Sequence, residues 1–315
     1  MLIIDQDRID RVLTWPALVD ALDAGHKLGR GQTHDLLLEE GGDVLLSRTA
    51  WKAGYGIGIK TVTGFFGNPG RTPPLPSVQG VFVLFDHADG RPLAVIDGAG
   101  ITEWKTAADS ALGSRYLSRP DARCLLMVGA GAMAGPLIRA HRSVRPAIEQ
   151  VLLWNRTPDR PEALAGALRG EGLAVEVATD LAAAVARADI VSSATRTEQP
   201  LIEGAWLRPG THLDLVGAFT ASMREADDAA LRRGRLFVDA RETTLEHIGE
   251  LKIPLERGVI RADAVIADLY DLAAGFAWRR APDDITIYKN GGGAHLDLMT
   301  AIAIHHGVVG QGDAA

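Results

Sequence analysis

Two stretches of the chain differ in how hydrophobic and polar residues follow one another. Between about residue 43 and residue 97, short apolar runs separated by turn residues predict an antiparallel sheet with mixed geometry. Ahead of it, Thr14 precedes Trp15-Pro16 and a periodic apolar run, which predicts a capped helix. An alanine-rich segment over residues 103–117 predicts a connecting helix. The strands expected in the sheet cover residues 44–46, 56–62, 78–85 and 93–96.

Pro120 marks a change of pattern. Beyond it, short apolar runs alternate with helical segments, which is typical of βαβ units in a parallel sheet covered by helices. Near residue 282 a strand-like run leads to three glycines and a last helix, from residue 294 to about 306, that can pack back on the N-terminal domain. The expected strands are 124–128, 151–154, 175–178, 190–194, 212–216, 236–238 and 285–289, and the helices are 133–142, 161–169, 181–187 and 223–233.

A glycine-rich turn follows the strand expected at 124–128. In Gly129-Ala130-Gly131-Ala132-Met133-Ala134, the glycines permit a tight turn and let backbone N–H groups approach a pyrophosphate at a helix N-terminus. The turn follows one expected strand and opens a helix, which is the context that a dinucleotide fingerprint requires. We interpret it as a nucleotide-binding turn, and a purely structural glycine turn is the alternative.

The next expected strand ends in Asn155-Arg156-Thr157 where an acidic residue is usual. Asp or Glu at that place binds the ribose 2′-hydroxyl of NAD, whereas arginine accommodates the 2′-phosphate of NADP. The sequence therefore predicts NADPH in preference to NADH, with Arg156 on the phosphate and Thr157 adding a hydroxyl contact. For Arg156, an exposed loop arginine is the alternative.

Composition narrows the class of protein. The chain has 315 residues, 47% of them hydrophobic, which is ordinary for a globular protein, and a net charge of -7 gives no electrostatic footprint for nucleic acid or an acidic membrane. Its one cysteine, Cys124, lies in an apolar run, so neither a disulfide nor a cysteine metal site is expected. No apolar stretch reaches the ~18 residues of a spanning helix. The N-terminus lacks a secretory pattern, and we expect a cytoplasmic location.

Several charged residues have two interpretations. In Ile57-Gly58-Ile59-Lys60-Thr61, alternation places Lys60 opposite the isoleucines, where it is either solvated or supplies charge or a proton to a substrate. From spacing alone the solvated interpretation is favoured. Arg48 and Lys105 are likewise interpreted as surface cations. Asp297 and His295 are interpreted as surface residues of the last helix, and Gly291-Gly292-Gly293 as an anion-binding loop or a flexible connection.

Taken in order, several segments resemble the ornithine cyclodeaminase/mu-crystallin family over nearly the whole chain. They are KTVT (60–63), PSVQ (76–79), LAVIDG (93–98), KTAADSA (105–111), GAG (129–131), WNRT (154–157), VGA (216–218) and YKNGGGAHLD (288–297). The resemblance implies an α/β protein in which residues 119–291 form a Rossmann-type doubly wound parallel sheet. Residues 1–118 with 292–315 would form an α+β substrate-binding and dimerisation domain completed by the C-terminal helix. A homodimer is implied.

The resemblance also implies site residues. Lys60 falls on the family's active-site lysine, which reverses the surface interpretation, and WNRT is similar to the segment with which mu-crystallin-type members bind NADPH. Arg48, Lys60 and Lys105 would hold a substrate carboxylate. The implied cofactor contacts are Thr106, Gly129, Gly131, Ala132, Met133, Asn155, Arg156, Thr157, Ala194, Thr195, Val216, Gly217, Lys289 and Gly292. No metal is expected.

Departures from the family pattern bear on the reaction. Cyclodeaminase and alanine dehydrogenase members carry an Asp that handles the substrate amine, and Phe219 stands at that position here. The family's arginine before Thr-Ala-Ala is Lys105, a point charge in place of a bidentate fork. Another family arginine falls near Asp35, and Arg48 close by can take its role.

These features predict an NADPH-dependent reductase of a small cyclic imino acid. Δ1-Pyrroline-2-carboxylate, reduced to L-proline, or Δ1-piperideine-2-carboxylate would be the substrate, with hydride delivered to the C=N carbon. The imine nitrogen would arrive protonated or take a proton from Lys60 or water. The alternatives are an amino-acid dehydrogenase acting on an open-chain imine, an ornithine cyclodeaminase, and a non-catalytic NADPH-binding protein of crystallin type.

Overall fold

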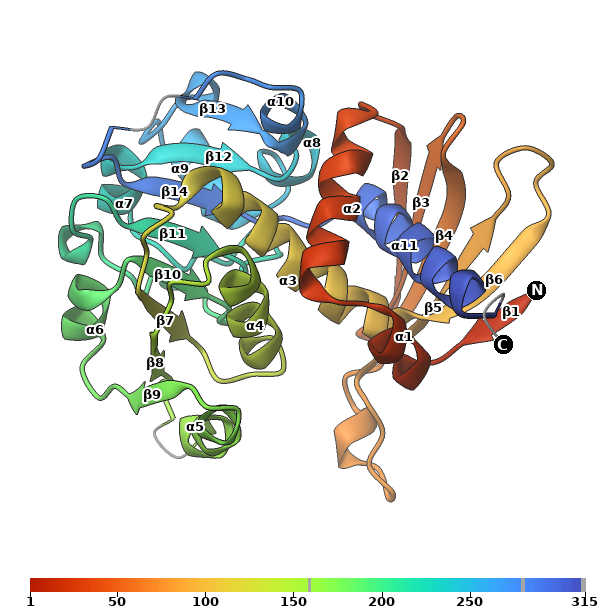
Figure 1. Ribbon diagram of the computed structural model, residues 1–315, viewed down its shortest axis with the longest axis horizontal. Coiled ribbons are helices and arrows are strands. Elements are labelled where there is room, and N and C mark those ends of the chain that lie inside the picture. Colours follow the sequence, from red (N-terminus) through yellow and green to blue (C-terminus); the bar gives the residue numbers. More distant parts are fainter. Residues whose placement is uncertain (158–159, 279–280, 313–315) are drawn as a thin grey trace. The chain divides into compact units, whose positions relative to one another are not determined.

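The chain folds into two compact units. The computed structural model describes residues 1–157, 160–278 and 281–312 (Figure 1). Met1–Lys105 with Gly293–Ala315 form the first unit, and Thr106–Gly292 form the second. The boundary falls inside helix α3 (Gly98–Leu117), whereas the sequence-based boundary follows residue 118. Because one continuous helix crosses the boundary, the hydrophobic pattern has no break there.

The first unit is built on a six-stranded sheet. Its strand order is β1-β6-β5-β4-β3-β2, and all neighbours are antiparallel except β1 and β6, so the mixed geometry is confirmed. The bounds are β1 (Leu2–Ile4), β2 (Gln32–Glu40), β3 (Asp43–Lys52), β4 (Gly56–Gly64), β5 (Val78–Phe85) and β6 (Pro92–Asp97), with a 3-10 turn η1 (Asn68–Gly70).

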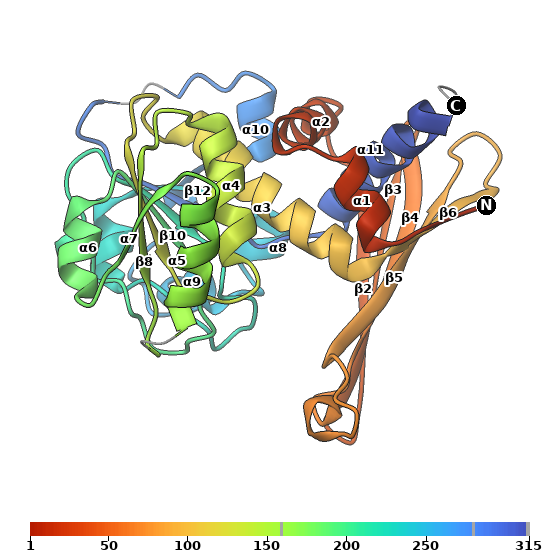
Figure 2. The same cartoon turned by 60° about the horizontal axis from the view of Figure 1, so that its bottom comes forward.

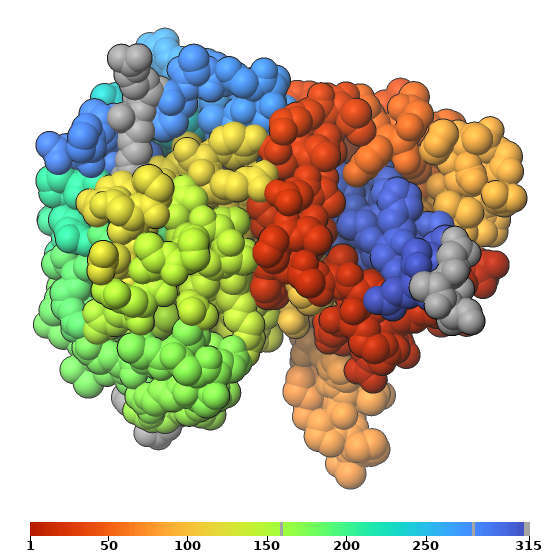
Figure 3. All heavy atoms as spheres, viewed as in Figure 1, coloured from red at the N-terminus to blue at the C-terminus, as the bar shows by residue number. Residues whose placement is uncertain are grey.

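Besides the start of α3, the described residues of this unit include the helices α1 (Gln6–Val12), α2 (Trp15–Lys27) and α11 (Ala294–Gly312). The Thr14 hydroxyl accepts a hydrogen bond from Ala17 N at 3.4 Å, which confirms the predicted cap of α2. The C-terminal helix α11 packs against α2 and across strands β2 to β5 (Figures 1 and 3). A Cβ on Gly25 would lie 2.7 Å from the Met299 sulfur, so glycine there allows α2 to approach α11 closely.

The second unit is a wholly parallel eight-stranded sheet, in the order β13-β12-β14-β11-β10-β7-β8-β9. Figure 2 shows α3 and α4 on one side of it and α6 and α7 on the other. The strands are β7 (Cys124–Val128), β8 (Gln150–Trp154), β9 (Ala174–Val177), β10 (Ile190–Ser193), β11 (His212–Leu215), β12 (Arg235–Val238), β13 (Val265–Asp268) and β14 (Thr286–Lys289). The helices are α4 (Ala134–Val144), α5 (Arg160–Gly170), α6 (Leu181–Arg187), α7 (Asp228–Arg233), α8 (Arg241–Thr244), α9 (Gly249–Glu256) and α10 (Leu269–Ala273), with 3-10 turns η2 (Gly204–Trp206) and η3 (Ala262–Ala264).

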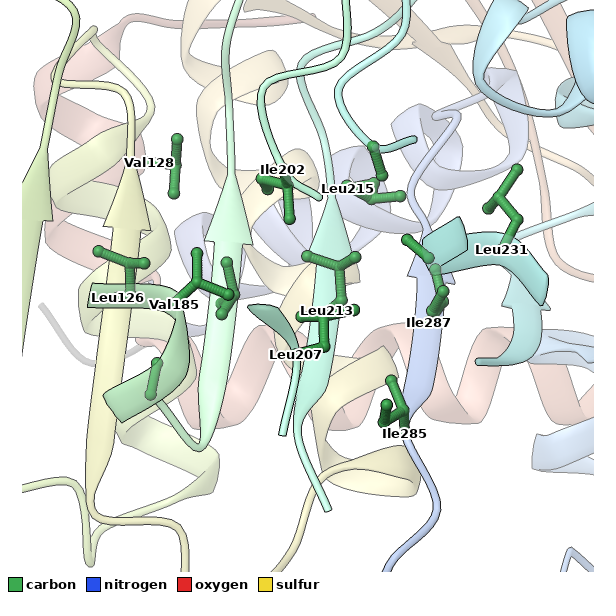
Figure 4. Packing of buried hydrophobic residues seen from close by; sticks show 14 of the residues in the cluster. Leu126, Val128, Val185, Ile202, Leu207, Leu213, Leu215, Leu231, Ile285 and Ile287 are labelled. Atoms are coloured by element: carbon green, nitrogen blue, oxygen red, sulfur yellow. The ribbon is translucent and has the colours of Figure 1, made fainter. Parts of the chain in front are cut away.

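The core of the second unit lies on both faces of the sheet. On one face, alternate residues of the central strands, among them Leu126, Leu213 and Ile287, pack against Val185 of α6 and Leu231 of α7 (Figure 4). Each fully buried leucine or isoleucine of this kind contributes about 1.5–3 kcal/mol relative to an exposed one. The edge of the cluster includes Cys124, and burial raises the pKa of its thiol to about 11. The thiol is therefore protonated and acts as a small hydrophobe.

Within the described ranges, no helix combines the length and the apolar character needed to cross a membrane. The same residues contain no cluster of three or more histidine, cysteine, aspartate or glutamate side chains arranged to bind a metal ion.

Candidate active site

The fingerprint turn has the backbone that only glycine adopts readily. Gly129 follows β7 with φ at 105°, and a Cβ there would lie 2.8 Å from the Ala194 carbonyl oxygen. Met133 is the N-cap of α4 and its side chain makes no capping bond, while Gly131 and Ala132 are exposed. In α4 itself Ala134 N donates to the Gly131 carbonyl at 3.0 Å and Pro136 has no N–H, so the open backbone at this turn is that of Gly131 and Ala132, which fits the close approach of a dinucleotide pyrophosphate.

Asn155 joins the end of β8 to this turn. Its Oδ1 accepts a hydrogen bond from Ala130 N at 3.1 Å, and its Nδ2 donates to the Thr157 carbonyl at 2.9 Å. Arg156 and Thr157 are exposed beside it. The structure thus brings the predicted 2′-phosphate residues next to the fingerprint turn. The side chain of Asn155 bonds to backbone groups of both segments.

The loops after β10 and β11 carry four more of the predicted cofactor contacts. Ala194 and Thr195 follow β10, Val216 and Gly217 follow β11, and the two strands are neighbours. A Cβ on Gly217 would lie 2.1 Å from the Thr195 carbonyl oxygen, so the two loops are in close contact. The strand order reverses between β7 and β10, and ligands of open parallel sheets bind outside the strand ends at such a point.

The remaining three predicted cofactor residues, Thr106, Gly292 and Lys289, differ in their hydrogen bonds and burial. The Thr106 carbonyl accepts a hydrogen bond from Asn290 Nδ2 at 2.9 Å, and Gly292 has φ at 66°, which glycine tolerates. Lys289 is fully buried, and its ammonium donates to the Leu215 carbonyl at 2.9 Å. The contact of Lys289 with the cofactor stays a prediction; in the structure its side chain is buried at the end of β14 and bonded to the last residue of β11.

In the first unit, Lys60, Lys105, Asp297 and Arg48 form what we call the cationic cluster. Lys60 Nζ lies 3.1 Å and Lys105 Nζ 3.7 Å from the same oxygen, Oδ1 of Asp297. Lys60 also donates to Thr102 Oγ1 at 2.5 Å, and that hydroxyl donates to the Gly98 carbonyl at 2.7 Å. Lys60 and Lys105 are each only 5% exposed and Asp297 is not exposed at all. The surface interpretations of these three residues are therefore wrong.

The cluster carries more positive than negative charge. Burial lowers the pKa of Lys60, Asp297 raises it in part, and Lys105 lowers it further. Burial raises the pKa of Asp297, but Lys105, Lys60 and Arg48 outweigh burial and hold it below its ordinary value. Asp297 Oδ2 has no hydrogen-bond partner among the described residues. A buried site with a surplus of cations is suited to an anion such as a carboxylate.

Arg48 lies beside this group at its more open side. It stands opposite Lys60 in the register of β3 and β4, and its Nε lies 3.0 Å from Asp35 Oδ2. The three cations predicted to hold a carboxylate are thus neighbours, although the Arg48 guanidinium also serves an ion pair with Asp35.

His295 is a fourth residue whose surface interpretation is wrong. It is 7% exposed and its ring meets the His26 ring edge-on, with 5.7 Å between centroids. Burial, followed by the charges of His26 and Lys105, holds the pKa of His295 well below its ordinary value. The imidazole is therefore neutral in the physiological range.

The sequence contains an indication that Asp297 is buried, which the interpretation of the last helix as a surface helix missed. Helix α11 is apolar on all sides, with Leu296, Leu298 and Ala301 all buried. A helix of that kind lies in an interior, so an acid in its first turn needs a buried cationic partner. Thr102 and Glu225 carried no comparable signal.

The second unit has the Rossmann-like α/β fold and the glycine turn typical of dinucleotide-binding proteins, and the first unit holds a buried cluster of cations around one carboxylate. The model of the ornithine cyclodeaminase/mu-crystallin family matches residues 40–312. The chain belongs to this family.

Three known proteins illustrate the similarity. The chain is 53% identical over 290 residues to a Δ1-pyrroline-2-carboxylate reductase of Paracoccus denitrificans, covering 92% of this chain and 91% of that protein. The structure of the Thermococcus litoralis Δ1-pyrroline-2-carboxylate reductase in complex with NADH and L-proline superposes with a TM-score of 0.90 at 26% identity, covering 99% and 98% of the two chains. An archaeal alanine dehydrogenase dimer with bound NAD gives a TM-score of 0.91 at 25% identity, covering 99% and 97%.

Proposed function

We propose that the chain is an NAD(P)H-dependent reductase that converts Δ1-pyrroline-2-carboxylate, or its six-membered homologue, to the cyclic amino acid. The observation that carries the proposal is the cationic cluster, in which two buried lysines share one carboxylate. The 53% identical relative, which bears the name of this reductase, supports it.

The cluster supplies the substrate carboxylate with partners. An ammonium group has three N–H donors, and Thr102 and Asp297 occupy two of those of Lys60, so one remains for the substrate. Lys105 and Arg48 add charge. Because the carboxylate is fixed, the imine carbon is fixed as well, and orientation of this kind is worth several kcal/mol in a two-reactant step.

The reduced nicotinamide, when bound, supplies the hydride that is added to the imine carbon. The C=N electron pair then moves to the nitrogen, which must hold a proton. The lowered pKa of Lys60 makes its ammonium a usable donor for that nitrogen, and an iminium that arrives protonated is offset by the charge of Asp297. Phe219, in the loop after Gly217, cannot accept a proton, which disfavours cyclodeamination.

We further propose that NADPH is preferred over NADH. Arg156 is exposed next to the fingerprint turn, and Asn155 leaves no carboxylate there to repel a 2′-phosphate or to bind a 2′-hydroxyl.

We also propose that the chain forms a homodimer through the sheet of the first unit. Large apolar side chains on β2, β3 and β5 are exposed, among them Leu36, Leu37, Leu38, Trp51 and Val81. Exposed apolar residues gathered on one sheet mark an interaction surface. The archaeal alanine dehydrogenase of the same fold is a dimer, in agreement with this.

A single panel of assays tests the reaction. NADPH and NADH oxidation is followed with five- and six-membered cyclic imino acids, with 2-oxo acids plus ammonia or methylamine, and with ornithine. The proposal predicts fast oxidation with the cyclic imino acids alone. Oxidation only with a 2-oxo acid and an amine would indicate an open-chain dehydrogenase. Ammonia release from ornithine without net cofactor use would indicate a cyclodeaminase.

A further inference from the structure

The loops after β10 and β11 meet at one buried carboxylate, that of Glu225. Oε1 accepts hydrogen bonds from Ser193 Oγ at 2.6 Å and from both Thr195 N and Thr195 Oγ1 at 2.8 Å. Oε2 accepts from Gly217 N at 2.5 Å and from Ala218 N at 3.3 Å. One oxygen therefore holds the end of β10 and the other holds the end of β11.

The number of donors favours the ionised form of the Glu225 carboxylate. Five N–H and O–H groups donate to its two oxygens, so a proton on either oxygen would compete with donors already in place. Burial raises the pKa of Glu225, and Lys289 together with the hydrogen bonds opposes that rise. A full set of donors is what makes a buried charge tolerable.

A second buried carboxylate fixes the backbone of Glu225. Glu250, in the first turn of α9, accepts hydrogen bonds from Glu225 N at 2.7 Å and from Ala226 N at 3.0 Å. Both glutamates are completely buried. Among the described residues, the Glu250 side chain bonds to the segment that carries Glu225 and to neither loop, so the two side chains have separable roles.

The position of these two loops in the sheet indicates what the Glu225 carboxylate does by bonding to both of them. A dinucleotide lies across the point where strand order reverses, with one half on each side of it. The fingerprint turn and Asn155-Arg156 lie on the β7–β8 side, which serves the adenosine phosphate half. The loops after β10 and β11 lie on the opposite side, which leaves them the nicotinamide half.

We propose that Glu225 is a positioning residue for the nicotinamide ring, acting by locking the Thr195 and Gly217 loops against each other. The proposal rests on the proposed function only in requiring a nicotinamide cofactor. The carboxylate does not touch the ring in this assignment; it fixes two backbone segments that do.

Glu225→Gln tests the idea because it replaces one acceptor oxygen by an NH2 group that must face N–H donors of one loop. Binding is measured by fluorescence titration with NADPH and NADH, and with ADP-ribose and its 2′-phosphate, which lack the nicotinamide. We expect affinity for the tighter-binding dinucleotide to fall about 10-fold or more, as for loss of a charge-assisted bond. Affinity for the matching ADP-ribose should change less than about 2-fold, within the ordinary effect of a distant substitution.

Glu250→Gln is the matched control, since it alters an equally buried glutamate of the same polar group. We expect it to change the affinities for dinucleotide and ADP-ribose by the same factor. Equal losses for both ligands in Glu225→Gln, or no loss in either, would overturn the proposal. Should Glu225→Gln not fold, as judged by circular dichroism, Glu225→Asp decides by the same comparison, because its shorter side chain keeps the charge yet cannot reach both loops.

These measurements use no imine, so they are independent of the proposed reaction. A wild-type protein that reduces no cyclic imino acid but shows the selective loss refutes the proposed function alone. A wild-type protein that reduces the imine while Glu225→Gln binds both ligands normally refutes the role of Glu225 alone.

Discussion

Asp297 sets the charge balance of the cationic cluster. Both lysines contact its Oδ1, and Lys60, Lys105 and Arg48 together hold the pKa of Asp297 low in spite of its burial. An unpaired buried lysine would lose its proton instead, because burial favours the neutral amine. Asp297 is thus the residue that keeps two cations available for a substrate carboxylate.

Asp297→Asn removes that charge with little change of shape. We expect a loss of about 3 kcal/mol or more in the free energy of unfolding, because two buried lysines are left uncompensated. The KM for the imino acid should rise at least about 10-fold, as expected for the loss of a charge-assisted contact. Asp89→Asn, which alters an exposed ion pair with Arg91, is the control and should change stability by less than about 1 kcal/mol. Urea unfolding and steady-state kinetics measure both; unchanged stability in Asp297→Asn would contradict the account.

Arg156 is the residue on which cofactor preference depends. Arg156→Asp should raise the KM for NADPH by about 100-fold and leave that for NADH within about 3-fold, because a carboxylate repels a 2′-phosphate and accepts a 2′-hydroxyl. Arg232→Asp makes the same charge change at another exposed arginine of the second unit and should leave the ratio unaltered. Parallel changes for the two cofactors in Arg156→Asp would show that this side chain does not contact the 2′-phosphate.

At the scale of elements, helices and strands could be predicted from the sequence wherever the local pattern of apolar residues determines them. Strands buried on both faces give continuous apolar runs, and those at Cys124–Val128 and the helix at Leu181–Arg187 have the predicted bounds. Strand β2 was missed because all nine of its residues are exposed, so it has no alternation of burial to detect. The short α8 to α10 and β13 were missed because a few residues carry too little periodicity.

The candidate site was harder to predict than the strands. Alternation put Lys60 on the correct face of β4, but only the covering of that face by α11, far along the chain, makes the lysine buried. The resemblance to the family corrected this, whereas composition and spacing could not. Contacts such as that of Glu225 with two loops depend on long-range packing and leave no local pattern.

Strand β2 is also the element on which dimerisation can be tested. Leu37 is 54% exposed at the centre of β2, and Leu37→Glu would place a charge in the proposed interface. We expect the wild type to have twice the mass of one chain by light scattering and the variant to dissociate, since unpaired charge at an apolar interface is costly. Leu28→Glu, at a similarly exposed leucine outside the sheet, should remain dimeric. A monomeric wild type would contradict the proposal.

At the scale of the whole molecule, buried carboxyl groups make stability depend on pH. Burial, followed by the charge of Glu225, raises the pKa of Glu250 to about 7. The folded state therefore binds this proton more tightly than the unfolded chain, whose glutamate pKa is about 4.3. The contribution is fully present below that lower value and is lost as pH rises through about 7.

Glu250→Gln mimics the protonated side chain at every pH. Between pH 5 and pH 8 the wild type should lose stability relative to this variant, by on the order of 3 kcal/mol in total. Urea unfolding of the two proteins across that range isolates Glu250, since all other groups are shared. A difference in stability that stays constant from pH 5 to pH 8 would show that Glu250 does not titrate there.

The central claim is that hydride passes from the nicotinamide to the imine carbon of a cyclic imino acid. The most direct test is to supply NADPH deuterated at both C4 positions with Δ1-pyrroline-2-carboxylate and to analyse the product by mass spectrometry and NMR. We predict L-proline that carries a single deuterium at C2. Proline without deuterium at C2, or consumption of the substrate without formation of proline, would contradict it.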